Sequence, residues 1–137
     1  MLVHFLTGVV AYPGRCNGQH ANSKAFAVLD ASGTIHSWGE WSSGGTGAAP
    51  TGSGFISIAS NSGAFAALDS AGAISAWGSP NSGGSNAPTG SGFVSIASTD
   101  SAFAALHASG TISAWGSSSS GAPTGSGFVS IASAVYA

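Results

Sequence analysis

The ionisable side chains that could support acid–base catalysis are few in this sequence. A general acid–base pair needs two ionisable groups that converge in one pocket, and the available carboxylates are Asp30, Glu40, Asp69 and Asp100. Asp30 and Asp69 occupy the same position of an internal repeat, beside an expected hairpin turn, where His107 stands in the third copy. Aspartate at such a turn accepts hydrogen bonds from nearby backbone amides. We therefore interpret this position as structural.

The histidines and the single cysteine lack the spacing of a metal site. They are His4, Cys16, His20, His36 and His107. No His-x₃-His or Cys-x₂-Cys pair is present, and Cys16 and His20 stand four apart in a Gly/Asn stretch that does not favour a helix. His36 replaces the serine of the other copies, so we interpret it as a surface variation. We expect no metal and no other cofactor.

Serine is abundant, but its setting does not predict a nucleophile. No Gly-x-Ser-x-Gly elbow lies between an expected strand and a helix. The string Gly52-Ser53-Gly54 recurs in all three copies, as turn residues do. The glycine-rich loops lack the lysine and the following helix of a phosphate-binding loop. We predict that the protein is not an enzyme.

The tryptophans divide into two kinds. Three occupy one repeat position, and we predict that they pack between the units: Trp38, Trp77 and Trp115. Trp41 is different, because Pro80 and Ser118 take its place in the other copies. An indole that packing symmetry does not require can anchor a ligand or partner. The alternative is that Trp41 folds over its own unit.

Differences between the copies are concentrated in two kinds of loop. They are residues 22–24, 61–63 and 99–101, and the stretches after each Trp-Gly, 40–47, 79–86 and 117–120. Scaffold proteins carry recognition on such loops. The candidate binding residues are Glu40, Trp41, Asn81 and Asp100 in these loops, together with His107 at the hairpin turn.

Composition excludes several kinds of partner. Only 4% of the 137 residues are charged and the formal net charge is −2, against a usual charged share of about 25%. Because no basic patch can form, we expect no nucleic-acid binding. No segment is long and apolar enough to span a bilayer, so we expect no membrane partner. The low charge also leaves little electrostatic protection against self-association.

The N-terminal part of the chain does not repeat. We interpret residues 1–24 as a degenerate N-terminal segment or cap, because the apolar opening lacks a cationic start and is followed by Tyr12-Pro13-Gly14-Arg15. A targeting segment is the alternative. One cysteine fixes no redox compartment.

The rest of the chain is three near-copies of one unit. Trp38, Trp77 and Trp115 recur at a nearly constant spacing, and the units span residues 25–60, 61–98 and 99–133. Each complete unit holds three runs of strand length. They are Gly-Phe-Val/Ile-Ser-Ile-Ala-Ser, Ala-Phe-Ala-Ala/Val-Leu and Thr/Ala-Ile-x-x-Trp-Gly. A glycine between the second and third runs predicts a tight hairpin.

These runs predict an all-β fold of small stacked sheets. In the run that begins at Ala102, Phe103 and Ala105 face one way while Ala104 and Leu106 face the other, so both faces are apolar. Such a strand is buried on both faces. Two architectures cover small sheets in this way, a β-propeller with one blade per unit and, as the alternative, a β-solenoid.

The repeated string Ala-Phe-Ala-Ala-Leu-x-x-x-Gly-x-Ile-x-Ala-Trp-Gly, with the proline and Gly-Phe-Val-Ser-Ile-Ala-Ser that follow, supports the propeller. It resembles the repeats of the regulator-of-chromosome-condensation superfamily, and its compact period resembles that of the secreted β-lactamase inhibitor proteins with that fold. The resemblance spans residues 25–133 and favours an extracellular location. It implies a ring of seven three-stranded blades. Seven units of this length need about twice the 137 residues of the chain.

Either the chain is a piece of a longer protein, or copies of it assemble to close the ring. Residues 15–21 read RCNGQHA, so the first unit lacks its first strand, whereas the C-terminus carries a spare one, residues 127–133. The expected order is two strands, three, three and one. We predict that the spare strand pairs in trans with residues 25–29, giving a homodimer of six blades. A trimer, or residues 2–11 as the missing strand, are the alternatives.

The pattern as a whole predicts a non-enzymatic binding module that presents its variable loops to a protein or glycan partner. The alternative is a self-assembling structural or matrix protein that adds strands between copies. A flat ice- or surface-binding face is a third interpretation, although the threonines form no regular array.

Overall fold

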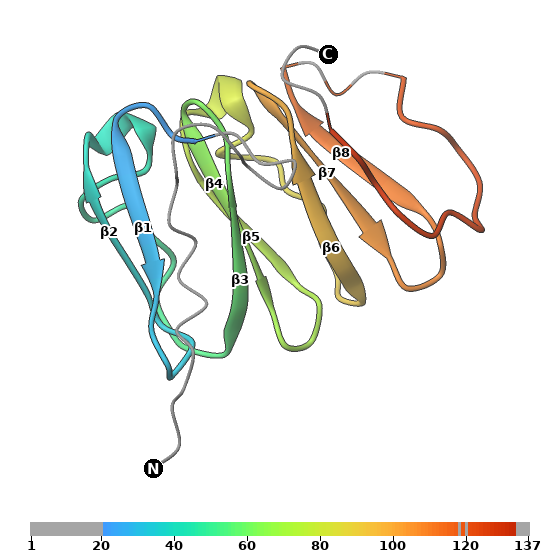
Figure 1. Cartoon of the computed structure of the whole chain (residues 1–137), viewed down its shortest axis with the longest axis horizontal. Helices are drawn as coiled ribbons and strands as arrows, with labels where there is room; N and C mark the ends of the chain where they lie inside the picture. The colour runs from blue at the N-terminus through green and yellow to red at the C-terminus, as the bar shows by residue number, and fades with distance from the viewer. Residues whose placement is uncertain (1–20, 118, 120, 134–137) are drawn as a thin grey trace.

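The computed structural model describes residues 21–117, 119 and 121–133, and these residues form an all-β fold apart from two single-turn 3₁₀ helices. The strands are β1 (Ala25–Leu29), β2 (Ile35–Gly39), β3 (Phe55–Ser60), β4 (Ala64–Asp69), β5 (Ile74–Gly78), β6 (Phe93–Ser98), β7 (Ala102–His107) and β8 (Ile112–Gly116). The 3₁₀ turns are η1 (Trp41–Ser43) and η2 (Pro80–Ser82). The strands form three antiparallel sheets, β1–β2, β3–β4–β5 and β6–β7–β8, which lie in a row in chain order (Figure 1). From here on a unit is one of these sheets with its loops, so the second unit begins at β3 and the third at β6.

Each sheet is built from a tight hairpin whose turn the sequence specifies. In the second unit β4 pairs with β5, so that Phe65 lies opposite Trp77. Gly72 in the turn has a φ of +81°, and a Cβ at this position would lie 2.6 Å from the backbone nitrogen of Gly92. Only glycine meets both requirements, the left-handed backbone and the close approach of the next strand. The turn glycine thereby fixes how consecutive units meet.

The core lies between the sheets rather than within one of them. One apolar cluster joins the first and second units and contains Ala25, Ile35, Ile58, Phe65, Ala67 and Trp77. Another joins the second and third units and contains Ala64, Ala66, Leu68, Phe93, Phe103 and Trp115. In β4, Phe65 and Ala67 face the preceding unit while Ala66 and Leu68 face the following one. A strand that contributes to two clusters is apolar on both faces, as predicted.

The first unit has two strands among the described residues, as predicted, but one expectation about the ends changes. The ladders among the described residues all run antiparallel within one sheet, and none of them joins one sheet to the next. Residues 127–133 form no ladder, so the described strands number eight rather than nine. The strands β3 and β6 each pair with the strand that follows them in the chain, β4 and β7, and no described strand follows residue 133. Residues 2–11 lie outside the described residues.

The C-terminal segment nevertheless begins like the first strand of another unit. The amide of Phe128 donates to the carbonyl of Gly110 at 3.0 Å. The amides of Phe55 and Phe93 make the same bond to Gly33 and Gly72, at 3.1 and 3.0 Å. Residues 127–133 are therefore anchored on the third unit in the same way that β3 is anchored on the first unit and β6 on the second.

Candidate functional site

Four of the five predicted binding residues lie at one end of the sheets. Backbone hydrogen bonds join the loop after each Trp-Gly to the turn before the second strand, from Glu40 to Lys24, from Ser79 to Gly63 and from Ser117 to Ser101. We call this the loop end, defined by residues 22–24, 61–63, 99–101, 40–47 and 79–86. Glu40, Trp41, Asn81 and Asp100 belong to it. In Figure 1 it is the upper end, which carries the 3₁₀ turns.

Trp41 is the most exposed aromatic residue of the loop end. It opens η1, and 74% of its surface is accessible. The turn closes with Gly44 in the left-handed conformation, whose amide donates to the Trp41 carbonyl. No ring contact holds the indole among residues 21–133 as described. The indole therefore faces solvent instead of folding over its own unit.

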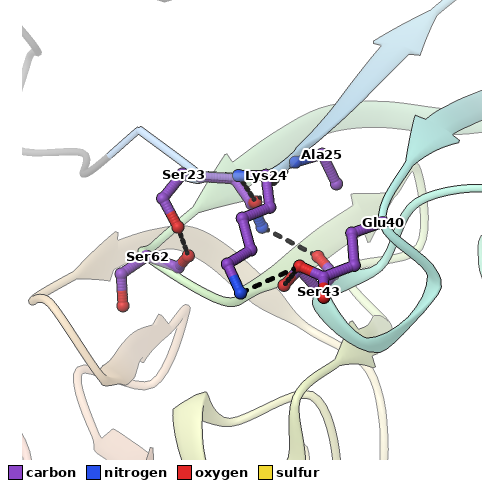
Figure 2. Close-up of polar contacts among 7 residues, drawn as sticks. Ser23, Lys24, Ala25, Glu40, Ser43 and Ser62 are labelled. Atoms are coloured by element: carbon purple, nitrogen blue, oxygen red, sulfur yellow. Dashed lines mark hydrogen bonds and ion pairs between the residues drawn. The ribbon is translucent and has the colours of Figure 1, made fainter.

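Beside Trp41, the loop end carries an ion pair. Lys24 Nζ lies 3.1 Å from Glu40 Oε2, and Figure 2 shows the lysine reaching across the turn to that carboxylate. The hydrogen bond from Lys24 lowers the pKa of Glu40 below its usual value, although partial desolvation opposes the shift. Lys24 is one of only two cationic residues in the chain. The first unit thus places an indole and a charge pair on one surface.

Two asparagines hold the loop end together, and sequence reasoning did not single them out. Asn61 is fully buried, and its Nδ2 donates to the Ser82 carbonyl at 2.6 Å while Oδ1 accepts from the amides of Gly63 and Ala64. Asn22 makes the same three bonds in the first unit. The recurrence of asparagine one unit apart was the signal that could have identified them. The third unit has Thr99 here, which lacks the amide.

Serine hydroxyls continue the loop end from unit to unit. Ser23 donates from its amide and its hydroxyl to the Ser62 carbonyl, at 3.2 and 2.9 Å, and Figure 2 shows the two serines facing each other. Ser62 donates in the same way to the carbonyl of Asp100, at 3.2 and 2.7 Å. Asp100 takes the next place in this series but carries a carboxylate in place of a hydroxyl. Asn81 lies exposed on η2, and its carbonyl accepts a bond from the Ser117 hydroxyl.

His107 lies apart from the other candidates. It ends β7 at the hairpin-turn end of the sheet, where Nδ1 accepts from the Ser109 amide at 3.0 Å and Nε2 lies 3.0 Å from the Ser91 carbonyl. The tautomer with its proton on Nε2 satisfies both contacts. The structure therefore does not bring His107 together with the loop-end residues.

The turn interpretation of the equivalent aspartates is confirmed. Oδ1 of Asp30 accepts from the amides of Ser32 and Thr34, and Asp69 accepts from Ala71 and Ala73. Asp30 also lies 2.9 Å from His36 Nε2. Bonds from the Ser32 hydroxyl, then His36, then the Thr34 amide hold the pKa of Asp30 well below its usual range.

The three repeated tryptophans share one geometry but not one environment. Each stacks on the phenylalanine opposite it in the hairpin, with ring centroids 5.2 to 5.3 Å apart. Trp77 and Trp115 lie between units and donate to the carbonyls of Gly44 and Gly83 in the preceding unit, both at 3.0 Å. Trp38 is 47% exposed. No described unit precedes it, so the expected packing between units is absent there.

Within the described residues, no group of three or more His, Cys, Asp or Glu side chains converges to hold a metal ion. Cys16, His4 and His20 lie outside those residues. No described helix is long and apolar enough to cross a membrane. The chain matches no protein-family model, and no curated protein matches it.

Proposed function

We propose that this protein is a non-enzymatic binding module that contacts a protein or glycan through its loop end. The observation that carries the proposal is the exposed Trp41, on a turn whose equivalent in the next unit has proline. The framework of stacked rings, turn glycines and asparagine bonds accounts for the other repeated residues. It does not account for an indole that is 74% accessible.

The neighbours of Trp41 supply the polar part of such a surface. Glu40, Lys24 and Asp100 place most of the chain's few described charges at the loop end. Aromatic anchors with polar rims are typical of binding surfaces. An indole face also stacks on the apolar face of a sugar ring, while its N–H bonds to hydroxyls.

A propeller-type scaffold is part of the proposal. Three small sheets in a row, packed face to face through Phe–Trp pairs and alanines, support it, as does the resemblance of the repeated string to the regulator-of-chromosome-condensation repeats. In such a scaffold the loops of successive blades lie on one face. The proposed binding surface therefore extends across all units.

The experiment is a binding screen of the purified chain on a glycan array and against a panel of defined extracellular proteins, with Trp41→Ala screened in parallel. We expect ligands whose binding to Trp41→Ala is weaker by on the order of tenfold or more, because central aromatic anchors contribute about 2 kcal/mol or more. Val94→Ala is the matched control, since Val94 is an apolar residue that is 55% exposed at the opposite end of the sheets. Ligands that bind both variants like the wild type would contradict the loop-end site.

A self-assembling structural protein is the second candidate function. A separate observation favours it, the exposed Phe–Trp pair at the start of the row and the unladdered segment at its end. Growth of the wild-type chain into assemblies without a fixed stoichiometry would give this function first place.

A further inference from the structure

We propose that the two ends of this chain are complementary, and that a second copy docks head to tail to close a two-copy ring. The entry face is Phe26, Val28, Trp38 and the outer edge of β1. The exit end is Gly121 together with residues 127–132. Each copy carries both, so the contact is heterologous and two such contacts close the ring. This contact does not depend on the proposed binding function.

The entry face is an exposed apolar surface. The equivalent surfaces of the second and third units are buried. Phe26 and Trp38 stack with centroids 5.2 Å apart, yet they are 58% and 47% exposed. The equivalent pair in the third unit, Phe103 and Trp115, is 1% and 4% exposed. The second unit buries its pair to the same degree. The same geometry is therefore covered by a neighbouring unit wherever one precedes it.

A glycine of the preceding unit does the covering. Gly44 is buried against the second pair, and a Cβ added to it would lie 2.8 Å from Cδ2 of Phe65 and 3.0 Å from Cδ1 of Trp77. Its carbonyl also accepts the Trp77 indole hydrogen bond. Gly83 has the same role for the third pair. Each junction thus needs a left-handed glycine directly against the two rings.

The exit end already has this glycine in place. Gly121 has a φ of +85°, against +89° for Gly44 and +86° for Gly83. It is exposed, and a Cβ added to it meets nothing within 4 Å. The backbone of Gly121 therefore already has the conformation with which Gly44 and Gly83 cover a Phe–Trp pair. Among the described residues, no further Phe–Trp pair follows the third unit.

The strand that the first unit lacks also lies at the exit end. Residues 128–133 read FVSIAS, identical to β6, and are anchored through Phe128 to Gly110 as β6 is anchored to Gly72. Among the described residues, the strand β1 is laddered on one side only, whereas β4 and β7 are laddered on both. The register of β3 on β4 would place Ile131 opposite Val28 and Ala132 opposite Ala27. One interface thus supplies both the strand and the covering glycine.

Two departures from the internal junctions make the contact between copies weaker than those within a copy. Val28 stands where Ala67 and Ala105 are fully buried, so two more methyl groups must be accommodated. Asp100 lacks the hydroxyl that Ser23 and Ser62 donate to the next carbonyl, although Lys24 would lie beside it in the partner. We therefore expect reversible association that depends on concentration.

The test is light scattering of the full chain across a concentration series, with one variant for each side of the junction. The wild type should approach twice its 13.1 kDa mass. Gly121→Asn tolerates a positive φ but places a side chain against the rings of the partner. Trp38→Ala removes the entry-face indole. Each variant alone should raise the dimer dissociation constant by on the order of tenfold or more.

Mixing the two variants distinguishes this contact from others. Trp38→Ala keeps an intact exit end and Gly121→Asn an intact entry face, so the mixture should form a one-to-one dimer that neither variant forms alone. A dimer in which two entry faces meet would persist in Gly121→Asn and overturn the proposal.

The controls preserve the type of substitution. Gly47→Asn matches Gly121→Asn, because Gly47 has a φ of +75° in open space and its counterpart in the second unit is Asn86 with a φ of +61°. Trp41→Ala removes an exposed indole outside the junction. Both should dimerise like the wild type, with far-ultraviolet circular dichroism confirming that every variant is folded.

A wild-type chain that stays monomeric at all concentrations would overturn the proposal. Open-ended growth that both junction variants stop would retain the contact and overturn the two-copy ring. Dimerisation by Trp41→Ala with loss of its ligand binding would show that the two functions are separate.

Discussion

At the scale of single residues, most side-chain hydrogen bonds among the described residues are made with backbone atoms. The chain has few charges, and the described carboxylates at Asp30 and Glu40 both accept bonds that lower their pKa values. A carboxyl group whose pKa is lower in the folded protein than in the unfolded chain stabilises the fold at pH values above its pKa in the unfolded chain. That contribution is lost as pH falls toward the folded pKa.

The Asp30 turn gives a prediction of pH dependence. An aspartate in an unfolded chain has a pKa of about 4, so the charge of Asp30 should contribute fully above that pH. Asp30→Asn keeps the Oδ1 acceptor and removes the charge. We expect the variant to be less stable than the wild type at pH 6, and the difference to shrink as pH falls below about 4. Urea unfolding at pH 6, 4 and 2.5 measures this, and a difference that stays constant with pH would contradict it.

The buried asparagine gives a second prediction. Asn61→Ala leaves one carbonyl and two amides of the loop end without their bonds in a site closed to water. We expect a loss of about 2–3 kcal/mol in the free energy of unfolding. Asn22→Ala removes the same bonds in a half-buried site, where water can replace them, and should cost about 1 kcal/mol. Denaturant titration compares the two, and equal losses would show that burial does not set the cost.

At the scale of the element, the hairpin of the second and third strands is the repeated building block. It places the Phe–Trp stack on the face toward the preceding unit, and alanines with a leucine on the face toward the following unit. The turn glycine lets the next strand approach at van der Waals distance. Stability therefore resides in the junctions between units.

Tryptophan substitutions test where this stability resides. Trp115 donates to the Gly83 carbonyl at a buried junction, so Trp115→Ala should open a cavity, leave that carbonyl unbonded and cost about 3–5 kcal/mol. Trp38 is already about half exposed. Trp38→Ala, measured at a concentration where the chain is monomeric, should therefore cost only about 1–2 kcal/mol. Equal losses in the free energy of unfolding, measured by denaturant titration, would mean that the Phe–Trp stack within each hairpin contributes more to stability than the junction between units.

At the scale of the whole molecule, the row of units begins and ends with surfaces that the internal junctions bury. A repeat array needs caps or partners at its ends, because each unit buries its apolar face only against a neighbour. In this chain the first face shows two exposed rings and the last shows an exposed left-handed glycine. Stability should therefore be linked to the concentration of the chain.

That linkage gives the last prediction. If a second copy binds only the folded state, a tenfold rise in concentration near the dissociation constant should raise Tm by about 3–5 °C. Gly121→Asn should show a Tm that changes less with concentration over the same range, while Gly47→Asn should behave like the wild type. Differential scanning fluorimetry over two decades of concentration measures this, and a constant Tm for the wild type would contradict the linkage.

The sequence by itself determined the local structure of this protein. The hairpins, their turn glycines, the all-β class and the two-faced apolar strands follow from residue types at short spacing, because φ preferences and strand periodicity are local properties. It also indicated which loops differ between copies, and so predicted Trp41 as an anchor.

Only the tertiary structure decided how equivalent residues differ. Trp38, Trp77 and Trp115 share nearly the same local sequence, yet one is exposed and two are buried, since burial depends on whether another unit lies against the ring. His107 is not part of the candidate site because it lies at the end of β7 that is far from the variable loops. The role of Asn61 emerged for the same reason, as its partner Ser82 stands far along the chain and is brought near by the fold.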